Sequence, residues 1–166
     1  MLRVFCFGDL GLTVEDVYLV DPDPDRGGHE RGVRVELRPV EPQDRRGSPN
    51  ASQPVALGQA IWRGDFLESV KGGPGTKDRM HHHPGMRAGE PGRRVFEPGL
   101  TDDPMAWLEK RLGDLEPLLD AAGVPVTPAH RHAAAVLRDN LTEVVGTITT
   151  VLSEVRAGTL AHSPPE

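Results

Sequence analysis

The spacing of the apolar residues changes near Gly99 and divides the chain into two kinds of structure. Before this point apolar side chains alternate with polar ones, most clearly in residues 33–37, where Val, Val and Leu are separated by charged residues. An alternation of period two is typical of a strand with one buried face. Beyond Gly99 the apolar residues recur at spacings of three and four, which is typical of amphipathic helices. The sequence therefore predicts an α+β fold, with an antiparallel sheet in residues 1–98 followed by an antiparallel helical hairpin in residues 99–158.

Both expected helices begin with favourable capping residues. Asp103 precedes Pro104, and Thr127 precedes Pro128, so each helix has an N-cap side chain and proline at its first position. The second helix is expected to run without a break to Gly158. The tail, residues 159–166, is expected to be frayed.

The second helix carries an apolar stripe that the shorter first helix can cover only in part. The stripe comprises Leu137, Leu141, Val144, Ile148, Val151 and Val155. Several aliphatic side chains left in water would be unfavourable, so the stripe must be buried against the sheet or across a two-fold axis. The small residues at Gly146 and its neighbours would allow close approach of two helices. We therefore expect a homodimer through this helix.

Composition limits the class of protein. A chain of 166 residues suits one domain with a core of its own. There is no apolar run of about 18 residues and no basic-then-apolar N-terminal segment, so we expect a cytoplasmic protein that does not cross a membrane. The single Cys6 cannot form an internal disulfide and is expected to be a buried thiol in the first strand.

Charge is unevenly distributed along the chain. The formal net charge is −6, yet residues 51–100 carry seven basic and five acidic side chains. An acidic protein with one basic region is poorly suited to general binding of duplex nucleic acid, which needs many phosphate contacts. The basic region remains compatible with a small anionic substrate or a short single-stranded RNA.

Residues 60–84 hold most of the side chains that can carry chemistry. Two extended segments are joined there by a loop rich in Gly and Pro, which predicts an antiparallel hairpin. Side chains alternate between the faces of a strand, so His81 and His83 share a face and His82 lies on the other. A register that brings the polar faces together would place four residues on one surface: Arg63, Asp65, His81 and His83.

Two imidazoles at spacing two on a strand form a natural chelate for a divalent transition metal such as zinc, iron, copper or manganese. A third ligand from Asp65, His29 or Glu90 would complete a set of three with open coordination positions. Alternatively, His81 and His83 belong to a basic surface patch that binds an anion, or are purely structural. The pattern favours the metal site among these three interpretations.

The predicted function is metal-dependent hydrolysis or oxidation of a small substrate, with Arg63 holding an anionic group and with Asp65 and Arg79 as further catalytic candidates. No dinucleotide fingerprint occurs, which argues against a nicotinamide or flavin enzyme. A non-enzymatic protein that binds a partner through its helical hairpin is an alternative.

A resemblance supplies another alternative. The pattern Arg63-x-Asp65, a glycine-rich turn and Lys77-Asp78-Arg79-x-His81-x-His83, followed by Glu90-Pro91 and Arg94-x-Phe96, is similar to the core of TumE-type toxins of bacterial toxin–antitoxin pairs. The likeness covers residues 60–120. It implies a small cytoplasmic α+β ribonuclease in which a histidine acts as general base and Arg63 and Arg79 hold the scissile phosphate. The His-His-His-Pro segment also resembles the signature of an uncharacterised actinobacterial family.

Overall fold

The computed structural model describes residues 1–20 and 28–163, and its centre is an antiparallel six-stranded sheet. The strands of this sheet are β1 (Leu2–Phe7), β2 (Leu10–Leu19), β3 (Glu30–Glu41), β4 (Ala56–Leu57), β5 (Trp62–Ser69) and β6 (His81–His83). Their order is β1-β2-β3-β5-β6, and β4 pairs with the end of β3. A separate two-stranded hairpin joins β7 (Met86–Arg87) to β8 (Glu90–Pro91). The predicted hairpin of residues 60–84 is therefore the β5–β6 pair at one side of the sheet.

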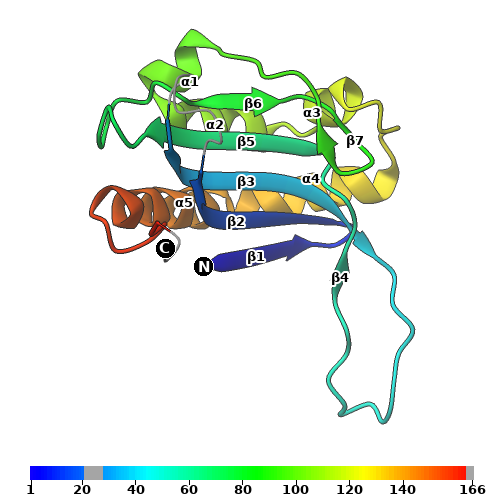
Figure 1. Cartoon of the computed structure of the whole chain (residues 1–166). Coiled ribbons are helices and arrows are strands. Elements are labelled where there is room, and N and C mark those ends of the chain that lie inside the picture. The colour runs from blue at the N-terminus through cyan, green and yellow to red at the C-terminus, as the bar shows by residue number, and fades with distance from the viewer. Residues whose placement is uncertain (21–27, 164–166) are drawn as a thin grey trace.

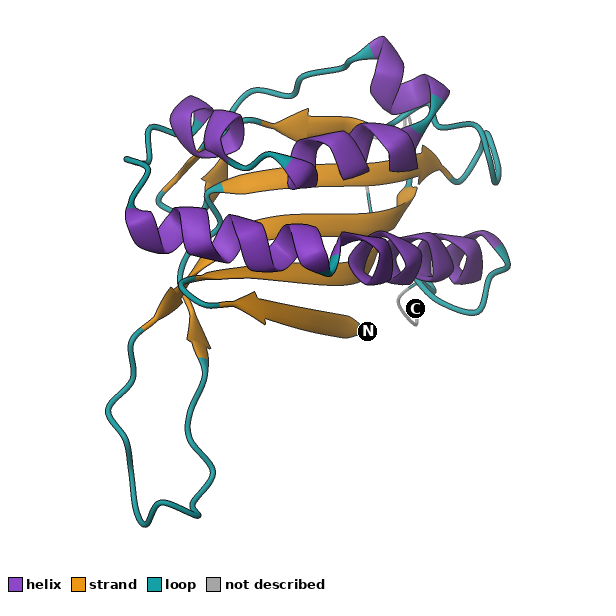
Figure 2. Cartoon of the chain, turned by 180° about the vertical axis from the view of Figure 1, so that it is seen from behind, coloured by secondary structure: helices purple, strands orange, loops and turns teal. Residues whose placement is uncertain are grey.

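Helices follow the strands in the chain and cover one face of the sheet (Figures 1 and 2). They are α1 (Pro98–Asp102), α2 (Pro104–Gly113), α3 (Glu116–Ala121), α4 (Pro128–Asp139) and α5 (Leu141–Arg156). The other face, which Figure 1 shows toward the viewer, carries no helix and is called the open face below. The predicted α+β class, with an N-terminal antiparallel sheet and C-terminal helices, is confirmed. None of the helices in the described residues is long and apolar enough to span a bilayer.

The core lies between the sheet and the helices. The alternating residues of β3 lose all their solvent exposure there: Val33, Val35 and Leu37 are 0% exposed. Across β5 they pair in register with Phe66, Gly64 and Trp62, so both strands turn their apolar sides toward the helices. Alternation then sends Arg34 and Glu36 of β3 and Arg63 and Asp65 of β5 to the open face.

Both predicted helix starts are correct. The Asp103 side chain accepts a hydrogen bond from the Ala106 amide (3.1 Å), and Thr127 accepts one from the His130 amide (3.1 Å). Such N-caps satisfy backbone N–H groups that have no partner within the helix.

Each of the two expected helices is interrupted. Pro117 has no N–H to donate to the Gly113 carbonyl, and that oxygen accepts a hydrogen bond from Arg138 Nε instead (3.2 Å). The first helix therefore divides into α2 and α3. The second divides at Asn140, whose side-chain amide donates to the Val136 carbonyl (2.8 Å) and competes with the helical pattern. The prediction of one continuous helix to Gly158 was wrong.

The apolar stripe lies inside the single chain. Leu137, Val144, Ile148, Val151 and Val155 are at most 1% exposed, and Leu141 packs against the same core. The sheet and the other helices cover it, because α5 lies across β2 and β3. Of the two expected ways to bury the stripe, the intramolecular one is realised. A homodimer remains a prediction, and the stripe does not support it, because its residues are already buried within one chain.

Asp16 on β2 contacts both the first residue of the chain and the segment that follows α5. Its carboxylate contacts the Met1 ammonium group and accepts a hydrogen bond from the Ala161 amide (2.7 Å). Ala161 is buried, so this part of the tail is tied to the sheet, while residues 164–166 lie outside the described chain. Cys6 is exposed, contrary to expectation, because its register partner Gly11 belongs to the open face of the sheet.

Candidate metal centre

The pairing of β5 with β6 brings the predicted site residues together. Arg63 is opposite His83, Gly64 is opposite His82, and Asp65 is opposite His81. Because Gly64 faces the helices, the two outer pairs face the open side. The predicted sharing of faces is thus confirmed for all three histidines.

Asp65, His81 and His83 form a tight cluster. The Nε2 atoms of His81 and His83 lie 3.5 and 3.4 Å from the same atom, Asp65 Oδ2. The three residues are 2–4% exposed, and their donor atoms lie within 4.8 Å of one another. Within the described residues, this is the one group of three or more His, Cys, Asp or Glu side chains that could hold a metal ion.

Backbone carbonyls fix the orientation of both imidazoles. His81 Nδ1 lies 2.7 Å from the Arg79 oxygen, and His83 Nδ1 lies 2.9 Å from the Gly92 oxygen. A carbonyl oxygen only accepts, so each Nδ1 carries a hydrogen and donates it. In the neutral ring each Nε2 then presents a lone pair to Asp65. Histidine ligands of metals are commonly oriented by such an N–H to carbonyl bond.

The protonation states suit ligands. Burial lowers the pKa of His81 and outweighs the opposing effects of the Arg79 carbonyl and Asp65, which favours the neutral ring. For Asp65, burial raises the pKa, but the hydrogen bond and positive charge of the Arg34 guanidinium favour the ionised form, and the pKa lies below its usual range. Arg34 Nε donates to Asp65 Oδ1 (2.8 Å), which leaves Oδ2 for the histidines.

With both rings neutral, this arrangement places lone pairs of imidazole nitrogen against an ionised carboxylate oxygen. A cation between them converts the repulsion into attraction. Around a tetrahedral metal with bonds of about 2.0–2.1 Å, neighbouring donor atoms lie about 3.3 Å apart. The distances of 3.5 and 3.4 Å from Asp65 Oδ2 are close to this value, and all three donor atoms lie within 4.8 Å of one another.

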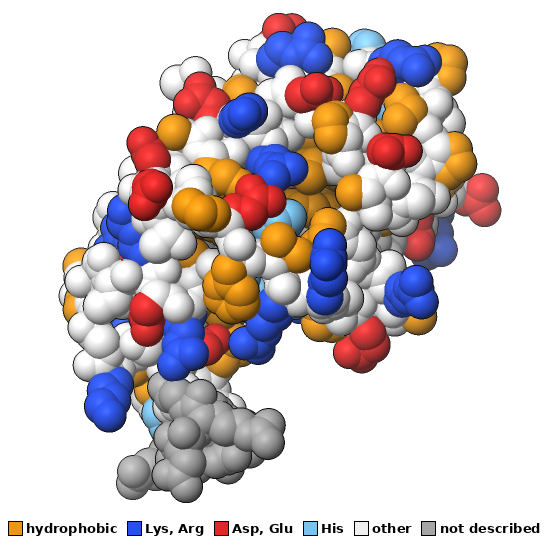
Figure 3. Space-filling view, turned by 90° about the horizontal axis from the view of Figure 1, so that it is seen from above, with side chains coloured by type: hydrophobic (Ala, Val, Ile, Leu, Met, Phe, Trp, Pro, Cys, Tyr) orange, Lys and Arg blue, Asp and Glu red, His pale blue; other side chains and the backbone are white. Residues whose placement is uncertain are grey.

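The segment after β8 closes one side of the cluster. Val95 exchanges two backbone hydrogen bonds with His82 (3.0 and 2.9 Å) and so continues the sheet beyond β6. The Phe96 ring then lies 5.4 Å from the His81 ring, centroid to centroid. Figure 3 looks onto this side of the molecule, where histidine surface shows in a hollow between charged and hydrophobic side chains.

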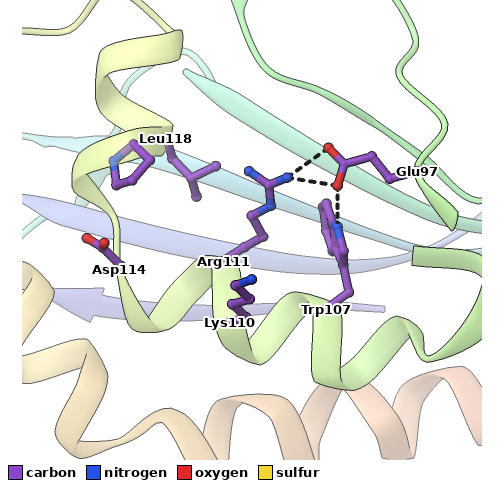
Figure 4. Close-up of a pocket in the computed structure, with 7 residues that line it drawn as sticks. Glu97, Trp107, Lys110, Arg111, Asp114 and Leu118 are labelled. Atoms are coloured by element: carbon purple, nitrogen blue, oxygen red, sulfur yellow. Dashed lines mark hydrogen bonds and ion pairs between the residues drawn. The ribbon is translucent and has the colours of Figure 1, made fainter. Parts of the chain in front are cut away.

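On the helix side of the sheet, Glu97 joins β6 to α2. Its carboxylate accepts hydrogen bonds from Trp107 Nε1 (2.7 Å) and Arg111 (2.8 Å) and lies 3.0 Å from His82 Nε2. The Arg111 guanidinium also lies over the Trp107 ring (5.0 Å). Figure 4 shows Glu97, Trp107 and Arg111 at the wall of a pocket of about 320 Å³. The network holds the segment that covers the metal centre.

The other predicted residues lie apart from the cluster or are engaged elsewhere. Arg63 is near it but donates Nε to Glu36 (2.7 Å). Arg79 lies 3.6 Å from Glu30 and contributes its carbonyl to His81. His29 is exposed and contacts the Tyr18 ring, and Glu90 is exposed on β8. Of the three candidates for the third ligand, the structure brings Asp65 to the histidines.

Three residues that build or support the site were not identified from the sequence. Arg34 belongs to the polar side of the alternating strand, but only the β3–β5 register reveals that it faces Asp65. Gly92 acts through its carbonyl, which no side-chain pattern signals. Glu97 directly precedes Pro98, and its partners Trp107 and Arg111 have the one-turn spacing of a helix face. That spacing was the available signal.

Comparison of the chain with protein-family models, with curated proteins and with solved structures finds no match.

Proposed function

We propose that the protein binds one divalent transition-metal ion through Asp65, His81 and His83 and uses it to hydrolyse a small substrate. The observation that carries the proposal is the position of both Nε2 atoms at one carboxylate oxygen, while both Nδ1 atoms donate to carbonyls. A neutral histidine in this tautomer has no hydrogen to give Asp65. A metal ion satisfies all three side chains at once.

The number of ligands favours catalysis over a structural metal. Structural zinc sites commonly use four protein ligands, whereas catalytic sites use three and leave a position for water or substrate. A divalent ion held by these three residues would supply a nucleophile for hydrolysis by lowering the pKa of water. Burial of all three ligands favours a small substrate.

Two histidines with one carboxylate are the ligands of several catalytic zinc sites, so zinc and hydrolysis are the first expectation. Iron bound at the same site, with an oxidative reaction, is the alternative.

The burial of the histidines favours the metal site over a metal-independent ribonuclease. His81 and His83 are 2% and 4% exposed, so an RNA phosphate would have limited access to a histidine base.

Elemental analysis of protein purified without an affinity tag tests the proposal. We expect about one zinc ion per chain, and loss of the ion in the double variant His81→Ala and His83→Ala. His82→Ala and His132→Ala are the matched controls, because His82 faces the helices and His132 is exposed on α4. Circular dichroism checks that each variant is folded.

Absence of a transition metal, or equal loss in the controls, would contradict the metal site. Iron in place of zinc would support the oxidative reaction. Growth arrest on expression, with RNA cleavage that persists in a chelator and disappears in Arg63→Ala, would instead support the ribonuclease.

A further inference from the structure

Arginine side chains flank the metal centre along the open face. Arg34 is the cross-strand partner of Asp65, and Arg63 is the partner of His83. Val95 pairs with His82, so alternation places Arg94 beside His83 on the side away from Arg63. The contact of Phe96 with His81 agrees with this pairing.

These guanidinium groups retain donors for a ligand. Arg34 and Arg63 each use Nε to bind a carboxylate, and their side chains are 21% and 14% exposed. Among the contacts of described residues, their terminal amino groups make no hydrogen bond, and Arg94 makes no hydrogen bond or ion pair through its side chain. Several N–H groups near the metal centre are thus available.

The local charge is positive. The three arginines are balanced by two carboxylates, Asp65 and Glu36, and Glu36 is also shared with Arg38. A bound divalent ion adds two further positive charges. Partly buried surroundings strengthen the attraction of such a surplus for an anion.

We propose that the open face beside the metal is an oxyanion site, in which a carboxylate or phosphate group of the substrate binds the metal through one oxygen and Arg94 and Arg63 through another. This inference rests on the proposed function and gives the substrate class: a small anionic molecule. The planar guanidinium fork matches the paired oxygens of both groups.

The test uses the full-length, untagged protein loaded with Co²⁺, whose visible absorption reports on its ligands. Acetate and phosphate are titrated separately at constant ionic strength, which distinguishes a carboxylate from a phosphate site. Arg94→Gln is compared with Arg93→Gln. Arg93 is the matched control because it is also exposed, adjacent in sequence, and lines a different pocket with Met86 and Ala122.

We expect Arg94→Gln to raise the Kd of the preferred anion by about fivefold or more, with cobalt content unchanged, because a charge-assisted hydrogen bond is lost. Arg93→Gln should leave the Kd unchanged. Equal Kd values in the wild type and Arg94→Gln, an equal loss in both variants, or no spectral response to either anion would overturn the oxyanion site. A chain that takes up no cobalt would overturn the proposed metal function itself.

Discussion

His82 Nε2 lies 3.0 Å from Glu97 Oε1, on the face of the sheet opposite the two histidines that flank it. One short strand therefore serves two purposes. Its outer residues form the metal centre, and its middle residue is bound to the carboxylate that also holds Trp107 and Arg111 on α2. Through Glu97, α2 is therefore connected to the strand that carries the two histidine ligands.

The first prediction concerns the Glu97 network and pH. Burial raises the pKa of Glu97, but hydrogen bonds from Trp107, Arg111 and His82 outweigh it and hold the pKa below its usual range. The stabilisation is therefore complete above the unfolded value of about 4.3 and is lost as pH falls through the lower folded value. Glu97→Gln should lower the free energy of unfolding by about 1–2 kcal/mol at pH 7.

Urea unfolding between pH 3 and pH 7 measures this effect. The difference between the wild type and Glu97→Gln should shrink at the acidic end. Glu109→Gln, on an exposed position of α2, is the control and should change little at any pH. A difference that is independent of pH would show that the Glu97 charge is not the stabilising feature.

The second prediction concerns stabilisation by metal. At a free Zn²⁺ concentration of 100 times its Kd, the folded chain should gain about 2.7 kcal/mol. For a domain of this size that is an increase in Tm of roughly 5–10 °C. Asp65→Asn should lose most of the increase, whereas Glu90→Gln should keep it, because Glu90 lies on the exposed β8. The reverse result in thermal scans would make Glu90 the third ligand.

The third prediction concerns the apolar stripe. Ile148 is 0% exposed within one chain, so Ile148→Val should cost about 0.5–1.5 kcal/mol of stability and Ile148→Asp should prevent folding. Denaturant titration measures the cost, with Thr142→Ala, exposed on the same helix, as control. A folded monomer from Ile148→Asp, together with a dimeric wild type in sedimentation, would show instead that the stripe is buried between two chains.

The fourth prediction compares two glycines. A Cβ at Gly146 meets no atom within 4 Å, so Gly146→Ala should stabilise α5 by about 0.5–1 kcal/mol. A Cβ at Gly32 would lie 2.1 Å from the Phe66 carbonyl oxygen and force β3 from β5, so Gly32→Ala should strongly destabilise the fold. Thermal unfolding distinguishes them. Loss of a dimer in Gly146→Ala would instead indicate close helix approach at this position.

The sequence determined the parts of this protein that depend on local periodicity. Alternation in the strands separated His81 and His83 from His82, and helix-period spacing identified the stripe around Ile148. Capping chemistry located the starts at Asp103 and Thr127. These features follow from backbone geometry within a few residues, so they can be read without knowing which elements meet.

Tertiary structure alone decided which elements meet. The choice of Asp65 over His29 and Glu90 beside the histidines depends on the register of β5 and β6, which side-chain alternation alone does not specify. Burial of the α5 stripe depends on the sheet lying beneath it. The exposure of Cys6 has the same origin, because an apolar strand has two faces and only the packing of the helices determines which one is covered.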